Sequence, residues 1–103
     1  MTRFLNLCMA ACLVTLAGIA VAGSGSSGCV NWTSEARTMG FAYKHLVHLD
    51  NQCEEAMVCD VWTDVNPEVQ SVELEPLEQQ TVTTYIGSPS REFQASVECE
   101  EAD

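Results

Sequence analysis

Hydrophobic and polar residues alternate with a period of two through the C-terminal half of the chain. Four runs show this alternation, at residues 57–64, 69–74, 81–86 and 93–99. Successive side chains of a β-strand point to opposite faces, so each run predicts a strand with one apolar face. Turn-forming sequences around Pro67, Pro76 and Pro89 separate the runs. Short strands with frequent turns predict an all-β fold, and we favour a small antiparallel β-sandwich over a small barrel.

The same alternation predicts which side chains point into the core. They are every second residue of each run: Met57, Cys59, Val61, Thr63, Val72, Leu74, Val82, Thr84, Ile86, Phe93, Ala95, Val97 and Cys99. Trp62 falls on the opposite face of its strand, beside Val58 and Asp60. A partly exposed tryptophan is an interface candidate. The alternative is that Trp62 packs at a sheet edge or under the N-terminal segment.

Residues 34–50 fit two periodicities, because their apolar residues match one face of a helix as well as one face of a strand. A helix would hold Gly40 in its interior, at a cost of about 1 kcal/mol. We favour a strand from about Phe41 to Leu49, which runs directly into a turn. On that strand His45 and His48 point to opposite faces, so they would not share a metal ion.

The N-terminal 22 residues have the features of a signal peptide. Arg3 supplies a positive charge, an uncharged apolar run extends to Ala22, and Ala20-Val21-Ala22 has the small residues that signal peptidase requires. We therefore predict a cleaved signal peptide at 1–22. A flexible Gly/Ser lead-in at 23–28 and a small disulfide-bonded β domain at 29–103 would follow.

Two alternatives to simple cleavage remain open. The apolar run approaches the roughly 20 residues that span a bilayer, so it would also serve as a retained anchor. Lipid attachment at Cys12 or Cys29 is the second alternative, although neither cysteine has the usual sequence context. Cys8 and Cys12 are most simply apolar residues of the export segment.

Cleavage leaves Cys29, Cys53, Cys59 and Cys99, an even number in an exported domain, which predicts two disulfides. Cys59 and Cys99 both belong to apolar strand faces, so we favour Cys59–Cys99 with Cys29–Cys53. Cys53–Cys59 with Cys29–Cys99 is the alternative pairing. Zinc is disfavoured, because five residues separate Cys53 from Cys59, more than zinc motifs allow. The disulfides place the protein in the periplasm or outside the cell.

Acidic residues dominate the charge of the mature chain. Three basic and fifteen acidic residues follow position 22, for a formal net charge of −12. Such a surface repels nucleic-acid phosphates and anionic lipids, which argues against nucleic-acid or membrane binding. It also keeps a domain soluble, and we expect a monomer. A basic protein is the partner that this charge favours.

The sequence contains few candidates for chemistry. Asp60, Asp64, Asn66 and Glu68 surround one turn and form a weak calcium candidate, although they lack the glycine of an EF-hand loop. Without calcium they would form a solvated acidic turn. No nucleophile elbow, phosphate-binding loop or zinc-protease motif occurs in the chain, so we expect neither catalytic residues nor a cofactor.

Several segments together resemble a group of uncharacterised small exported bacterial proteins. They are Tyr43–Leu49, Asn51–Cys53, Cys59–Val61, Thr63–Pro67, Gly87–Pro89 and the late Cys99. The resemblance covers most of the mature chain. It implies a bacterial source and an immunoglobulin-like β-sandwich, and it assigns no activity and no site residues.

These observations predict a non-enzymatic exported acidic β module with a structural or protein-binding role. The alternative is an inhibitor of a basic extracellular or periplasmic enzyme, such as a lysozyme or a protease. Opposite charge would accelerate its encounter with such a target.

Overall fold

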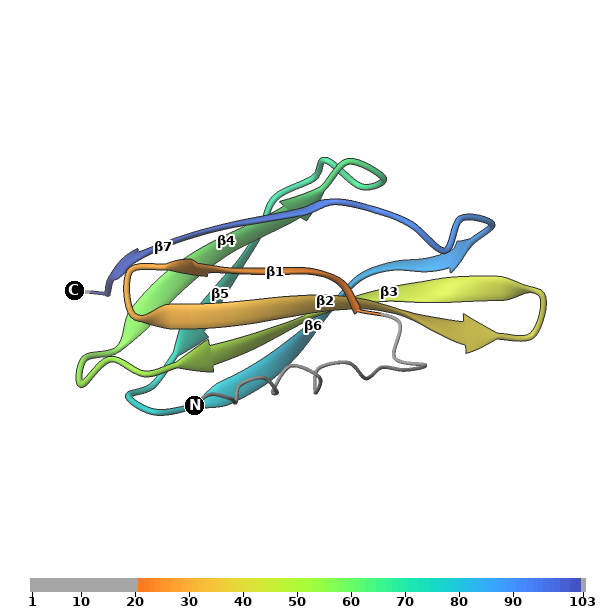
Figure 1. Cartoon of the computed structure of the whole chain (residues 1–103). Helices are drawn as coiled ribbons and strands as arrows, with labels where there is room; N and C mark the ends of the chain where they lie inside the picture. Colours follow the sequence, from red (N-terminus) through yellow and green to blue (C-terminus); the bar gives the residue numbers. More distant parts are fainter. Residues whose placement is uncertain (1–20, 103) are drawn as a thin grey trace, which may run out of the picture.

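The computed structural model describes residues 21–102, which form seven β-strands (Figure 1). Their bounds are β1 Val21–Ser27, β2 Val30–Met39, β3 Ala42–Asn51, β4 Met57–Thr63, β5 Gln70–Leu74, β6 Gln79–Ser88 and β7 Ala95–Glu101. The described residues contain no helix, and hence none that is long and apolar enough to cross a membrane. The predicted all-β fold is therefore confirmed.

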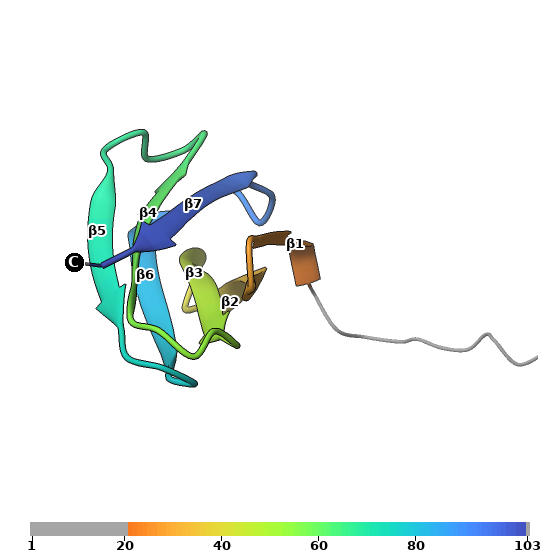
Figure 2. The ribbon, with the colours of Figure 1, turned by 90° about the vertical axis from the view of Figure 1, so that its left-hand side faces the viewer.

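The strands form two antiparallel sheets that pack as a sandwich (Figure 2). One sheet has the order β1-β2-β3-β6, and the other has the order β5-β4-β7. A division into four and three strands is also found in immunoglobulin-like sandwiches. In this protein β1, β2 and β3 follow one another in the chain and also lie side by side in the first sheet, each paired with the next as a hairpin.

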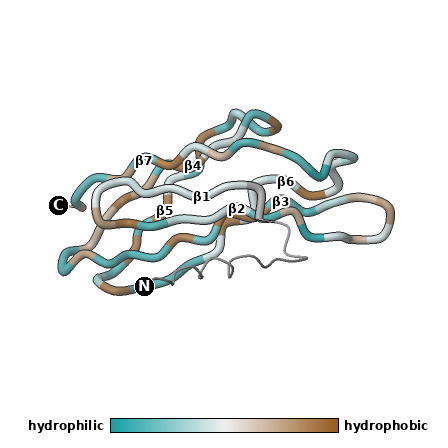
Figure 3. Tube along the Cα trace, in the orientation of Figure 1, coloured by the Kyte–Doolittle hydropathy of each residue, from teal (hydrophilic) through white to brown (hydrophobic). Residues whose placement is uncertain are grey.

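The hydrophobic core lies between the two sheets. It contains Val30, Val47, Leu49 and Val82 from the first sheet, and Met57, Cys59, Val61 and Leu74 from the second, together with Cys53 and Phe93. Along β4 buried and partly buried residues alternate as predicted. The hydropathy colouring shows hydrophobic and hydrophilic segments alternating along the strands (Figure 3).

Ile86 is a correction to the predicted core, because its side chain is 61 % exposed. The pairing of β3 with β6 shifts between His45 and Leu46, where Leu46 lies opposite Thr83 and His45 opposite Tyr85. One additional residue in β6 reverses the alternation beyond this β-bulge. In β6 the regular alternation of inward and outward side chains therefore continues only as far as Thr84.

The strand predicted from about Phe41 to Leu49 is confirmed as β3, but β2 was not predicted. A turn at Gly40-Phe41 joins the two strands, and Gly40 has a φ of 65°. A two-residue hairpin turn requires a positive φ at its first position, which glycine adopts without strain. Glycine is therefore favourable at position 40 in the hairpin turn, whereas it would have been destabilising in the interior of a helix.

The Gly/Ser segment 23–28, predicted as a flexible lead-in, instead forms most of β1 and the following turn. Val21 and Ala22, at the end of the predicted signal peptide, begin this strand, and the rest of that peptide lies outside the described residues. A Cβ atom at Gly25 would lie 2.8 Å from Cζ2 of Trp32 on β2. The absence of a side chain at Gly25 therefore lets β1 lie close to the indole ring.

The favoured disulfide pairing is confirmed. Cys59 and Cys99 face each other across β4 and β7, with their Cα atoms 4.0 Å apart. Cys29 in the β1–β2 turn joins Cys53 in the β3–β4 connection, with a Cα separation of 5.3 Å. Two disulfides indicate that the protein folds in an oxidising compartment.

Candidate functional site

The outer face of the β5-β4-β7 sheet carries acidic side chains around an apolar centre. Its residues, which we call the acidic face, are Val58, Asp60, Trp62, Ser71, Glu73, Ser96, Glu98 and Glu100. The three strands contain no lysine and no arginine. No opposite charge within the sheet therefore neutralises its carboxylates.

Cross-strand pairing brings like charges together on this face. Asp60 lies directly opposite Glu98, and Val58 is flanked by Glu73 on one side and Glu100 on the other. Like charges directly opposite in a sheet are destabilising. The Ser71 hydroxyl donates a hydrogen bond of 2.6 Å to Asp60, which satisfies only one carboxylate oxygen. The face is thus electrostatically unfavourable in the free protein.

Trp62 lies where the alternation of β4 predicts it, on the outer face and opposite Ser96 of β7. Its side chain is partly buried, and it is absent from both the core cluster and the hydrophobic residues that pack against that cluster. Nothing in the hydrophobic core therefore requires an aromatic residue at this position.

The weak calcium candidate is not assembled. The Asp60 carboxylate accepts a hydrogen bond from the Ser71 hydroxyl, and the Asp64 carboxylate accepts one of 2.9 Å from the backbone N–H of Gln94. Asn66 donates to the Thr84 carbonyl at 2.7 Å. Within residues 21–102 no group of three or more His, Cys, Asp or Glu side chains is arranged to hold a metal ion. Asp60 instead joins β4 to β5, while Asp64 and Asn66 join the turn that follows β4 to the segments at Gln94 and Thr84.

The two histidines lie on opposite faces of β3, as predicted. His45 is fully buried and stacks on Phe93, with ring centroids 4.1 Å apart. Its Nε2 lies 2.8 Å from the Ser90 carbonyl oxygen, so this nitrogen carries the proton and donates. His45 therefore joins the segment before β7 to the core.

His48 belongs to a chain of hydrogen bonds on the outer face of the first sheet. Its Nε2 lies 2.6 Å from Oε1 of Glu35, and its Nδ1 lies 2.8 Å from Oγ1 of Thr81. Arg37 donates to the other oxygen of Glu35 at 3.0 Å. The hydrogen bonds from Arg37 and then His48 lower the pKa of Glu35, because both stabilise the ionised carboxylate.

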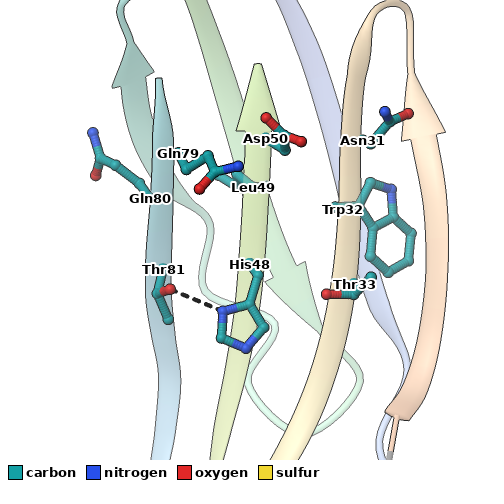
Figure 4. A pocket seen from close by; sticks show the side chains of 9 residues that line it. All are labelled: Asn31, Trp32, Thr33, His48, Leu49, Asp50, Gln79, Gln80 and Thr81. Atoms are coloured by element: carbon teal, nitrogen blue, oxygen red, sulfur yellow. Dashed lines mark hydrogen bonds between the residues drawn. The ribbon is translucent and has the colours of Figure 1, made fainter. Parts of the chain in front are cut away.

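This chain borders an open groove of about 490 Å³ that crosses β2, β3 and β6 (Figure 4). The residues that line it are Asn31, Trp32, Thr33, His48, Leu49, Asp50, Gln79, Gln80 and Thr81. In the register, Asn31, Asp50 and Gln79 form one cross-strand row, and Thr33, His48 and Thr81 form the next. Three strands thus contribute two polar rows to one surface.

A hydroxyl, an imidazole and a carboxylate in series also occur in the catalytic triads of hydrolases. Acyl transfer additionally requires hydrogen-bond donors, often backbone N–H groups, directed at the developing oxyanion. In β2 and β3 the N–H groups point within the sheet toward neighbouring strands, not into the groove. The hydrogen bonds to Glu35 and Thr81 therefore hold His48 in place, and within residues 21–102 the backbone of β2 and β3 offers this groove no oxyanion donor.

Sequence reasoning located Trp62 and Asp60 on one face but missed the groove. The β2 residues that line the groove lie in a polar segment, where hydrophobic and polar residues do not alternate clearly enough to predict a strand. The chain matches no known family model, and searches of curated proteins and of solved structures find no similar protein.

Proposed function

We propose that the protein is an exported, non-enzymatic module that binds a basic protein through its acidic face. The observation that carries this proposal is the like-charged pair Asp60–Glu98 across β4 and β7, with Glu73 and Glu100 beside it, next to a tryptophan that does not belong to the core. A cationic partner would relieve the repulsion between Asp60 and Glu98. The same contact would cover Trp62 and Val58 with apolar surface.

Charge and aromatic surface have different roles in this binding. The uncompensated carboxylates accelerate association with a cationic partner, an effect that salt screens. Tryptophan is enriched among residues that contribute most to interface affinity, especially near the centre of an interface. Trp62 shares the central strand β4 with Asp60, while Glu98 lies on β7 beside it. The face therefore combines long-range attraction with a central anchor.

The disulfides and the predicted signal peptide support an exported location, either periplasmic or secreted. We propose a monomer there, because a net charge of −12 opposes self-association. A sheet face has no projecting loop to enter an enzyme cleft, so general binding fits it better than active-site inhibition does.

The test is a titration of the purified mature protein against a panel of basic and acidic proteins, by calorimetry at low and physiological salt. Trp62→Ala is expected to weaken binding to a basic protein by more than tenfold, as expected for an interface anchor. Glu98→Gln is expected to weaken it severalfold at low salt and less at high salt. Far-UV circular dichroism establishes that each variant is folded.

Glu92→Gln is the matched control, since it removes the same charge from an exposed position in the β6–β7 connection. If Glu92→Gln weakens binding as much as Glu98→Gln, net charge alone attracts the partner and the acidic face is not the binding site. If no basic protein binds at physiological salt, the proposed function is wrong.

A further inference from the structure

The groove across β2, β3 and β6 lies on a different sheet from the acidic face. Its volume of about 490 Å³ is within the range of small-molecule sites, which extends from about 300 to 1,000 Å³. Such sites are usually lined by hydrophobic side chains. Here amides, hydroxyls, a carboxylate and an imidazole predominate, so an apolar ligand would leave many polar groups unpaired.

The donors and acceptors of the groove define the ligand further. Asn31 and Gln79 each offer an amide that donates and accepts, Thr33 offers a hydroxyl, and Asp50 offers a carboxylate that accepts. Among the described residues, the side chains of Asn31, Thr33 and Gln79 make no hydrogen bond to other protein groups. These three therefore keep their full capacity for a ligand.

The absence of lysine and arginine from the lining excludes strong binding of anionic groups. The Asp50 carboxylate in the lining would repel a phosphate or a carboxylate. A ligand of this groove is therefore uncharged and carries many hydroxyl groups, each of which both donates and accepts. We propose that the groove binds a neutral oligosaccharide.

The hydrogen bonds that border the groove hold one of its lining side chains in place before a ligand binds. His48 is held at both ring nitrogens, by Glu35 at 2.6 Å and by Thr81 at 2.8 Å, and Figure 4 shows the bond to Thr81. Holding groups in place before binding reduces the entropy that binding costs. His48 is thus a positioning residue that keeps the middle of the groove rigid.

Gels that contain a soluble neutral polysaccharide test the proposal, because binding slows the migration of the folded protein. The probes are a β-glucan, a galactomannan and a xylan, with alginate as the anionic counter-probe. At least one neutral polysaccharide is expected to retard the protein. Alginate is expected to have no effect.

Asn31→Ala and Gln79→Ala are each expected to weaken this binding roughly fivefold, the ratio that one hydrogen bond typically contributes. Gln94→Ala is the matched control, because Gln94 is an exposed glutamine in the segment before β7 and does not line the groove. The control is expected to bind as the native protein does. Trp62→Ala is expected to leave saccharide binding unchanged.

Three results would overturn the assignment. They are no retardation by any neutral polysaccharide, retardation by alginate alone, and retardation that Asn31→Ala and Gln79→Ala leave unchanged. Loss of saccharide binding in Trp62→Ala with intact binding in the groove variants would likewise place the site elsewhere. None of these results depends on whether the acidic face binds a protein.

Discussion

The two disulfides should contribute unequally to stability, and the inequality follows from their positions in the fold. Cys59–Cys99 spans a sequence separation of 40 residues, and Cys29–Cys53 spans 24. In the chain-entropy model, closing loops of these lengths stabilises the folded protein by about 4 and about 3.5 kcal/mol respectively. The two loops do not overlap, so their contributions should be nearly additive.

Burial adds to both losses. Cys59 is completely buried in the core, and Cys53 is also buried there. Replacing a buried sulfur by the hydrogen of alanine removes core contacts at a further cost of about 1 kcal/mol. We therefore expect the Cys59→Ala/Cys99→Ala variant to lose about 5 kcal/mol. The Cys29→Ala/Cys53→Ala variant should lose about 4.5 kcal/mol, of which about 3.5 kcal/mol comes from loop closure and about 1 kcal/mol from the buried Cys53 sulfur.

Equilibrium unfolding in urea, followed by tryptophan fluorescence and far-UV circular dichroism, measures both losses. Native domains of this size have about 5–15 kcal/mol of total stability, so the first variant should be marginal at room temperature. Both variants should show a larger m value, because the unfolded chain becomes less compact. An equal or larger loss from the Cys29–Cys53 pair would refute this reasoning, as would a loss below about 1 kcal/mol from the Cys59–Cys99 pair.

Three further substitutions test the contacts described above. Glu35→Gln should cost about 0.2–1 kcal/mol at neutral pH through loss of its exposed bond with Arg37. Because the folded state lowers the pKa of Glu35 from 4.5, its stabilisation is complete above pH 4.5 and is lost as pH falls through the lowered value, which urea unfolding across that range would show. Gly25→Ala should cost about 1–3 kcal/mol, because the new methyl group would overlap the Trp32 ring. Asn51→Ala should cost about 2–4 kcal/mol in thermal or urea unfolding, because this buried side chain satisfies three backbone groups of the β3–β4 and β5–β6 connections.

Each of these substitutions has a matched control in the same chain. Glu92→Gln removes an exposed carboxylate whose side chain makes no hydrogen bond within residues 21–102, so this substitution should change stability little. Gly23→Ala places a Cβ atom 3.5 Å from the Ser34 hydroxyl, an ordinary contact that should cost less than Gly25→Ala. Asn31→Ala changes an exposed asparagine and should leave stability nearly unchanged. Equal losses in a variant and its control would contradict the contact that the variant tests.

Part of the candidate site was predictable from the sequence. The period of two placed Trp62 and Asp60 opposite the Cys59 face, and the structure confirms this arrangement. The juxtaposition of Asp60 with Glu98 was not predictable, because it depends on the register between β4 and β7. The groove was missed for the same reason, since its two polar rows form only when β2, β3 and β6 lie side by side.

The sequence by itself determined the fold class, the inward face of β4 and the acidic character of the chain after residue 22. These properties follow from local alternation and from composition, neither of which requires knowledge of distant neighbours. Only the tertiary structure decided that 23–27 belongs to a strand and that a bulge turns Ile86 outward. Strand pairing joins residues far apart in the chain, and its register depends on partners that no local pattern identifies.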